Sequence, residues 1–321
     1  MSPPARVLPI SLCVLAACQG TPPSAGGDAI ERARAIAGFQ PFRIQATSCL
    51  GRALSFRPPS ATSQLEHSAA LELALDELEE DRSAWVWSGR QLAYLGRYRA
   101  SVGLYTVGLE VFNDDDVLLR HRGHRFITLR MFAAAEADLA RAWELVRDEP
   151  DTIEPDGLPN EAGIPRSTQK TNVLYHLALA RYLQEDFGGA AEAWESCLAI
   201  SPNDDMRVAA AYWLANSLRR DGRAEEAARA IAFVRPTMDI IENDSYHRLL
   251  LHFRGELDAG GVRGGVIDGT VASPTVAYGL TQELLQQGEE EAAREALLRV
   301  TQGEVWAAFG YIAAEADLAR L

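Results

Sequence analysis

Large and small apolar residues alternate over residues 82–147 in a pattern that repeats after 34 positions. Trp85 and Gly89 in the first stretch correspond to Leu119 and Gly123 in the second. Within each stretch the apolar residues recur three and four positions apart, which is the spacing of one face of a helix. The pattern therefore predicts two helical hairpins in which glycine lets the paired helices approach closely.

Three further copies of the pattern follow. The third begins near Thr171 and ends at Pro202, the fourth begins near Val208, and the weaker fifth begins near Pro274. Proline suits the end of a second helix because it cannot continue one. Residues 304–321 are expected to form a helix that covers the last apolar face. The prediction is an all-α chain: a solenoid of about five helical hairpins with a C-terminal capping helix.

Two stretches interrupt the repeat. Residues 148–167 contain four prolines and two glycines, so an inserted loop is expected between the second and third hairpins. Residues 239–258 are expected to contain a lone helix around Tyr246, followed by a glycine-rich loop over residues 259–269.

The period, the small residues at the eighth and twentieth positions of each unit and the aromatic residues between them resemble the tetratricopeptide repeat. The resemblance covers about two-thirds of the chain after Cys18, without the two interrupting stretches. It implies that the first helix of each unit lines a concave surface, and that the chain binds a partner there.

The first 28 residues have the features of a targeting signal followed by a flexible tether. The apolar run Val7–Ala17 is too short to span a bilayer. Leu15-Ala16-Ala17-Cys18 resembles the bacterial lipobox, which implies a lipoprotein signal peptide over residues 1–17 and an acylated Cys18. Gln19 after the cysteine implies the outer membrane, with the protein facing the periplasm. Residues 18–28 are small and polar, as in a flexible tether.

Residues 29–81 precede the hairpins. They are expected to form an extended segment over residues 39–60 and a capping helix over residues 61–80, where leucines recur at helical spacing. Cys49 lies here, and in an oxidising periplasm it could pair with Cys197. The alternative is that Cys197 is a small buried residue.

The charge of the chain restricts its partners. The formal net charge is −14, from 45 acidic and 31 basic residues. Nucleic-acid binding needs a basic surface that replaces the counterions of the phosphates, so no nucleic-acid partner is expected. Any basic site has to be local.

The predicted concave surface lacks acids. None of the 24 residues at its lining positions in the first four units is Asp or Glu. A basic, aromatic groove of this kind suits an anionic or aromatic partner. The alternative is that the aromatic side chains pack on neighbouring helices and the arginines pair with acids of the second helices or the inserted loop. The candidate partner-binding residues are Trp87, Arg90, Tyr94, Arg120, His121, His124, Asn172, Tyr175, His176, Tyr212, Trp213, Asn216, Arg219 and Arg220.

Catalysis and metal binding receive little support. His121 and His124 have the spacing of a metal pair on a helix, but the same motif has no carboxylate or cysteine. Hydrogen bonding in the groove is the expected role of these histidines and of His176. The chain has no phosphate-binding loop and no nucleophile elbow, so neither an enzyme nor a cofactor is predicted.

The sequence therefore predicts a lipid-anchored adaptor or scaffold that holds a protein or peptide segment in its concave groove. The alternative is a binding protein for a small anionic ligand, such as a glycan or nucleotide fragment, with residues 148–167 as a lid. An open trough favours the adaptor, whereas a closed pocket of roughly a few hundred cubic ångströms favours the small ligand.

Overall fold

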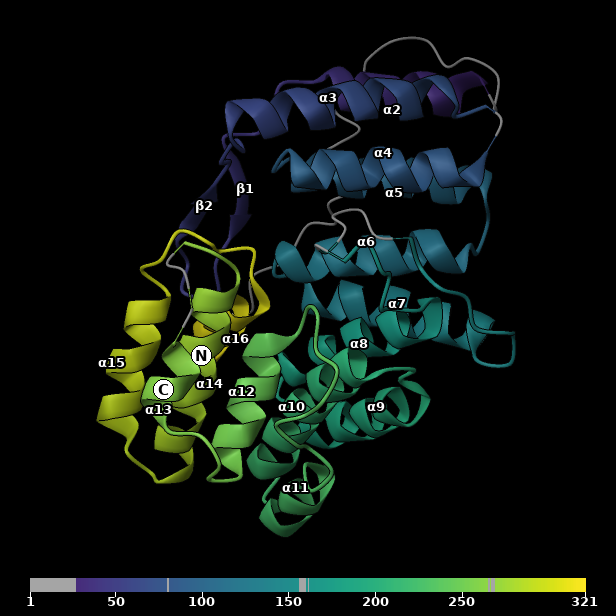
Figure 1. Ribbon diagram of the computed structural model, residues 1–321. Helices are drawn as coiled ribbons and strands as arrows, with labels where there is room; N and C mark the ends of the chain where they lie inside the picture. The colour runs from purple at the N-terminus through teal and green to yellow at the C-terminus, as the bar shows by residue number, and fades with distance from the viewer. Residues whose placement is uncertain (1–26, 80, 156–159, 161, 265, 267–268) are drawn as a thin grey trace, which may run out of the picture.

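The computed structural model describes residues 27–321 except 80, 156–159, 161, 265 and 267–268. This part of the chain is predominantly helical, with fifteen helices and one antiparallel hairpin (Figure 1). The elements are α2 (Gly27–Gly38), β1 (Ile44–Thr47), β2 (Ala53–Ser55), α3 (Ala61–Asp76), α4 (Arg82–Tyr94), α5 (Tyr98–Val111), α6 (Asp116–Thr128), α7 (Phe132–Val146), α8 (Gln169–Tyr182), α9 (Phe187–Ile200), α10 (Asp204–Arg220), α11 (Ala224–Ala230), α12 (Asp244–Phe253), α13 (Ala259–Arg263), α14 (Ala272–Gln286), α15 (Glu290–Val300) and α16 (Phe309–Leu318).

Six pairs of consecutive helices, from α4/α5 to α14/α15, are each connected by a turn of the same type. After the first helix of each pair, a residue with positive φ bonds its N–H to the carbonyl three residues back. The next N–H bonds to the carbonyl five residues back. This is the Schellman arrangement, which satisfies carbonyls at a helix end. The positive-φ residues are Gly96, Arg130, Glu185, Gly222, Gly255 and Gly288.

The turns mark the period of the chain. Gly96 and Arg130 are 34 residues apart, and Gly222, Gly255 and Gly288 follow at intervals of 33. The fold thus contains six helix pairs among the described residues, one more than the pattern predicted. The prediction of a lone helix followed by a loop is wrong for Ala259–Arg263, which forms α13. Asp258 caps this short helix by accepting the N–H of Gly261, and α13 packs on α12.

The first helices of the pairs form an inner layer. Helix α4 contacts α6, α6 contacts α8, and the series continues through α10 and α12 to α14 (Figure 1). Glycine permits the close approach within a pair, as predicted: an ideal Cβ on Gly123 would lie 2.7 Å from Leu139 Cγ, and one on Gly89 would overlap the ring of Tyr105.

The N-terminal region differs in part from its prediction. Residues 27 and 28 begin helix α2 instead of ending a tether, and α2 packs on α5 through buried Ala29, Ala33 and Ala37. The segment predicted as extended contains the β1–β2 hairpin, and α3 covers α4 as the predicted cap. The predicted signal peptide, Cys18 and residues 18–26 of the tether lie outside the described residues.

The C-terminal segment returns to the N-terminal end of the array. Trp306 Nε1 donates a hydrogen bond to the carbonyl of Ser55 at 3.2 Å, and its ring meets Tyr98 edge-on at 5.2 Å between centroids. Arg130 Nε lies 2.9 Å from the carboxylate of Glu315, 185 residues along the chain, and both side chains are buried. The array therefore closes on itself (Figure 1).

Both cysteines of the described chain are free thiols. Cys197 is fully buried, and burial raises its pKa to about 12. The possible Cys49–Cys197 disulfide is thus absent, and Cys197 is the small buried residue of the alternative interpretation. Among the described helices, none combines the length and hydropathy needed to cross a bilayer.

Candidate binding site on the concave face

A buried carboxylate, that of Glu154, lies among cationic side chains of α4 and α6. Its oxygens are 3.0 Å from Arg120 Nη2, 3.6 Å from Arg90 Nη1 and 3.5 Å from His121 Nε2. The amide of Asn172, on α8, donates a hydrogen bond to Glu154 at 2.7 Å. The side chains of all five residues are largely buried, and the most exposed of them, Arg90, is 13% exposed. Three successive first helices therefore converge on one carboxylate.

Backbone hydrogen bonds position Glu154. Residues 152–155, here called the strap, come from the insertion between α7 and α8. Ile153 forms an antiparallel bridge with Thr168, and the N–H of Glu154 donates to the carbonyl of Ser167 at 3.0 Å. Thr168 in turn caps α8 in a reciprocal arrangement with Thr171. The start of α8 thus orients the strap so that the Glu154 side chain faces the inner layer.

Cationic side chains outnumber this carboxylate. Burial, followed by the charges of Arg120, Arg90 and Arg125, holds the pKa of His121 well below its usual range. Burial also lowers the pKa of Arg120 and Arg125. Arg120 Nε is buried without a hydrogen-bond partner among the described residues, and Arg125 forms no ion pair there. The cluster therefore retains positive charge and a free donor, which favours a further anion.

Two more histidines lie next to the cluster. The rings of His124 and His176 are 4.2 Å apart, and both contact the ring of Phe309 at the start of α16. Burial holds the pKa of both well below the usual range, so both imidazoles are neutral at neutral pH. His176 Nδ1 donates a hydrogen bond to the carbonyl oxygen of Asn172 at 2.6 Å, because a carbonyl can only accept, and this places the proton on Nδ1.

A pocket of about 410 Å³ opens beside Asn172 and His176, between α8, α10, α12 and α14. Aromatic side chains make up much of its wall, and polar atoms converge behind them. The hydroxyls of Tyr175 and Tyr246 lie 3.0 Å apart, and Trp213 Nε1 donates to Tyr175 at 2.9 Å. This wall can receive an apolar or aromatic group and fix its polar end.

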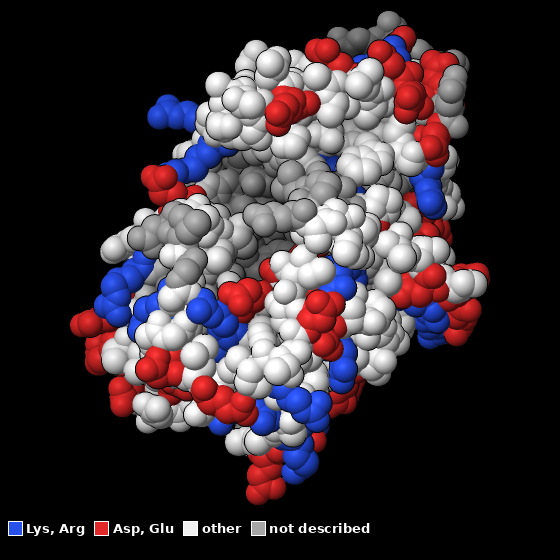
Figure 2. All heavy atoms as spheres, viewed as in Figure 1, with Lys and Arg blue, Asp and Glu red and all other residues white. Residues whose placement is uncertain are grey.

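A smaller pocket of about 210 Å³ is lined by the strap and by residues of α4 and α6. The guanidinium of Arg90 stacks 4.6 Å over Trp87, donates to the carbonyl of Pro155 at 2.8 Å and to Tyr94 at 3.3 Å. Glu154 lines this pocket and binds Asn172 in the wall of the larger one. Figure 2 shows the molecule hollowed between its N-terminal and C-terminal helices, with few charged side chains at the rim.

Three predicted groove residues are not accessible to a partner. Tyr212, Trp213 and Asn216 are completely buried, so they do not line an open groove as the repeat pattern suggested. Helix α12, which the repeat pattern did not include, packs over α10 and covers them: the ring of Tyr246 lies 4.9 Å from that of Tyr212.

Two predicted arginines do not join the cluster. Arg219 lies 4.2 Å over the ring of Phe253, and Arg220 forms an ion pair of 3.0 Å with Asp317 on α16. Of the four arginines predicted to bind the partner, only Arg90 and Arg120 therefore share a carboxylate. The alternative interpretation holds for Arg90 and Arg120, because Glu154 lies in the inserted loop. Asp317, the partner of Arg220, lies on α16, which that interpretation did not include.

Sequence reasoning missed three residues of this site: Glu154, Tyr246 and Phe309. Each lies outside the units that the period defined. For Glu154 the available signal was the proline-rich insertion itself, because long loops in compact domains are commonly functional.

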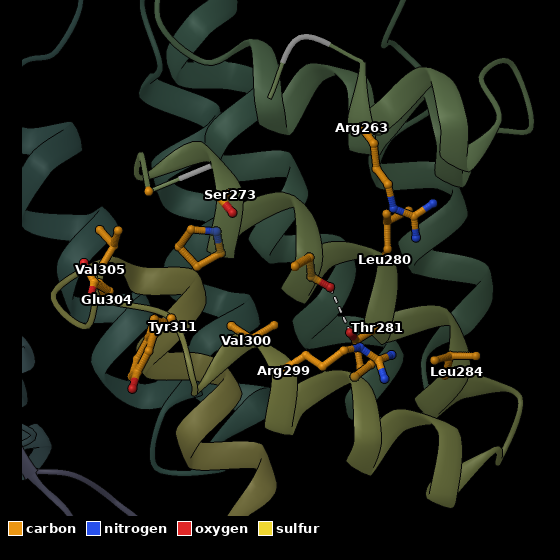
Figure 3. Close-up of a pocket in the computed structure, with 15 residues that line it drawn as sticks. Arg263, Ser273, Leu280, Thr281, Leu284, Arg299, Val300, Glu304, Val305 and Tyr311 are labelled. Atoms are coloured by element: carbon orange, nitrogen blue, oxygen red, sulfur yellow. Dashed lines mark hydrogen bonds between the residues drawn. The ribbon is translucent and has the colours of Figure 1, made fainter. Parts of the chain in front are cut away.

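A third pocket, of about 350 Å³, lies between α14, α15 and the segment before α16 (Figure 3). Arg263 and Arg299 lie on one side of it and Tyr311 on the other, and Thr281 donates to the carbonyl of Ala277 at 2.8 Å. Arg299 is 3.8 Å from Glu295, and both side chains are largely exposed. This pocket has no buried charge cluster among its described residues, so the Glu154 cluster remains the stronger candidate.

No family model matches the sequence, and no curated protein matches it. The geometry of the concave face is therefore the basis for assigning a function.

Proposed function

We propose that the chain is a tetratricopeptide-repeat solenoid that acts as a lipid-anchored envelope adaptor and binds an acidic segment of a protein partner on its concave face. The repeat assignment is supported by the 34-residue interval between Gly96 and Arg130 and by the common turn of the six helix pairs. The lipid anchor is supported by the lipobox-like residues that end at Cys18.

The observation that carries the proposal is the position of Glu154. A carboxylate from the chain itself lies against Arg90, Arg120 and the amide of Asn172, so the cluster has the donors that a carboxylate needs. Among the described residues, Arg120 Nε has no hydrogen-bond partner and Arg125 has no ion-pair partner, which leaves the cluster short of negative charge there. A partner's Asp or Glu side chain would complete the charge balance.

The neighbouring pocket determines what else the segment should contain. Tyr175, Tyr246 and Phe309 form an aromatic wall next to Asn172, which is itself a ligand of Glu154. An acidic residue with an aromatic residue close by in the same segment would occupy both sites. Buried aromatic anchors contribute a large share of the affinity in peptide recognition.

One observation favours a second function. The larger pocket, at about 410 Å³, falls within the size range of small-ligand sites, roughly 300–1,000 Å³. A small dianion with an apolar ring could bind beside the strap without any peptide. The two functions differ in whether the ligand extends beyond one pocket.

Fluorescence anisotropy with a labelled octapeptide of alternating Glu and Phe tests the adaptor function. We expect binding that weakens with salt and falls at least about tenfold in Arg90→Gln, because the cluster loses an accessible cation. A matched control is Arg229→Gln on α11, whose side chain is 68% exposed and remote from the strap. Equal affinity for a Lys–Phe octapeptide, or for both variants, would refute the proposal. A short aromatic dicarboxylate such as phthalate that binds as tightly as the octapeptide would favour the small-ligand function.

A further inference from the structure

One segment of this acidic chain contains no acids. Residues 32–65 include five arginines and neither Asp nor Glu, although acids make up 45 of the 321 residues. The segment runs from within α2 through the β1–β2 hairpin into α3. Basic side chains project from the edge of the molecule beside this hairpin (Figure 2).

Large apolar side chains are exposed in the same segment. Phe39, Phe42 and Ile44 are 55%, 41% and 46% exposed, and the two phenylalanine rings stack on each other at 6.4 Å. Of the eleven large exposed apolar side chains in the described chain, these three lie within six residues of one another. Their clustering is the feature that distinguishes an interaction surface from scattered exposed residues.

Arginines surround these rings. Arg99 places its guanidinium 5.2 Å over the ring of Phe42, and Arg43 is exposed between Phe42 and Ile44. Neither arginine forms an ion pair with a described acid, whereas Arg57, further along, is paired with Glu304. Phe39, Phe42, Arg43, Ile44 and Arg99 are here called the hairpin-edge patch.

We propose that the hairpin-edge patch binds the surface of an anionic lipid bilayer. Aromatic rings between arginines suit the interface, where the rings enter the headgroup region and the guanidinium groups contact lipid phosphates. The arginines give the patch a charge opposite to that of an acidic lipid. A second copy that docked through the same patch would instead bring like charges together, so a lipid surface fits the patch better.

The distance from the hairpin-edge patch to the predicted lipid anchor is compatible with contact between the patch and the same membrane. Eight residues lie between Cys18 and Gly27, and the nine Cα–Cα steps that join them can span at most about 30 Å. Helix α2, with 12 residues, adds about 18 Å before Phe39. The patch can therefore reach the membrane to which Cys18 would be attached, and a second contact would orient the concave face. This orientation rests on the proposed lipid anchor, but the lipid contact itself does not.

The test uses the full chain with Cys18→Ser, which cannot be acylated, so that failure of the anchor does not affect the outcome. The protein is sedimented with phosphatidylcholine vesicles that contain about a third phosphatidylglycerol, and with pure phosphatidylcholine vesicles. We expect binding to the acidic vesicles alone. The further changes Phe42→Ser and Arg43→Glu should reduce it at least about tenfold, without a change in melting temperature, because both side chains are exposed.

Leu73→Ser on α3 is the matched control, since Leu73 is 69% exposed but flanked by Glu72 and Asp76. Vesicle binding should persist in this variant. Absence of binding to acidic vesicles, or equal binding by Phe42→Ser, would overturn the proposal. Self-association that Phe42→Ser abolishes, without vesicle binding, would assign the patch to a second copy instead.

Discussion

The carboxylate of Glu154 lies 3.0 Å from the guanidinium of Arg120, and both side chains are buried on the concave side of the helical array. The two residues come from different features of the sequence, a proline-rich insertion and the first helix of a repeat. Because Arg90, His121 and Asn172 approach the same carboxylate, Glu154 engages donors that an acidic ligand bound beside it would also use.

Replacing Glu154 by Gln should increase the affinity for the acidic octapeptide by about tenfold, because the variant lacks the internal carboxylate that competes for Arg90 and Arg120. Anisotropy titrations of the wild type and the variant provide the measurement. Glu192→Gln, an exposed acid on α9, changes the net charge equally and should leave the affinity unchanged. Unchanged or weaker binding in Glu154→Gln would mean that Glu154 is part of the ligand site or only a structural ion pair.

Replacing Arg130 by Met should lower the free energy of unfolding by about 3–5 kcal/mol, because Glu315 would remain buried without its partner. Burial already raises the pKa of Glu315. The free energy of unfolding should fall less in the double variant Arg130→Met, Glu315→Met than in Arg130→Met, since no uncompensated buried charge remains. Urea unfolding of the three proteins measures this, and a double variant less stable than Arg130→Met would contradict it.

Gly123→Ala should lower the free energy of unfolding by about 1–3 kcal/mol, because the added Cβ would lie 2.7 Å from Leu139 where α6 and α7 cross. Gly38→Ala, at the end of α2, is the control: a Cβ there meets nothing within 4 Å, and its φ is not positive. Gly163 is a poorer control because its φ of 64° disfavours any side chain. Thermal melts decide the matter, and equal melting temperatures would show that the helix crossing tolerates a methyl group.

Stability should fall below pH 6.5 in part because of His176. Its folded pKa is held well below the unfolded value of about 6.5, chiefly by burial. As the pH falls through 6.5 the unfolded chain binds a proton that the folded chain does not, so stability decreases. His176→Gln should therefore lose less stability than the wild type between pH 7.5 and pH 5.5. Urea unfolding at the two pH values measures it, and identical losses in both proteins would exclude His176 as a contributor.

Cys18→Ser should release the protein from membranes into the soluble fraction if Cys18 carries the acyl chains, since these contribute most of the anchoring free energy. Incorporation of labelled palmitate by the wild type, and its loss in the variant, provides the direct measurement. A wild-type protein that incorporates no label would refute the lipoprotein proposal and leave the concave site unaffected.

Local signals in the sequence determined the helical pairs. The 34-residue interval between Gly89 and Gly123 reflects a local contact, in which each glycine meets a residue of the helix that follows it, Tyr105 or Leu139. Helix spacing, caps and turn residues depend on neighbours within a few positions, so they can be read along the chain. The same reasoning located the inserted loop and the capping helix at residues 61–76.

Tertiary structure decided which lining residues form a site. Arg90, Arg120, Arg219 and Arg220 were all predicted to line the groove, but the first two meet Glu154, whereas Arg219 packs on Phe253 and Arg220 pairs with Asp317. These partners lie in an insertion, in a helix pair with a weak pattern and in the C-terminal helix. Their contacts join residues that are far apart in sequence and carry no local period, so only the closure of the array could bring them together.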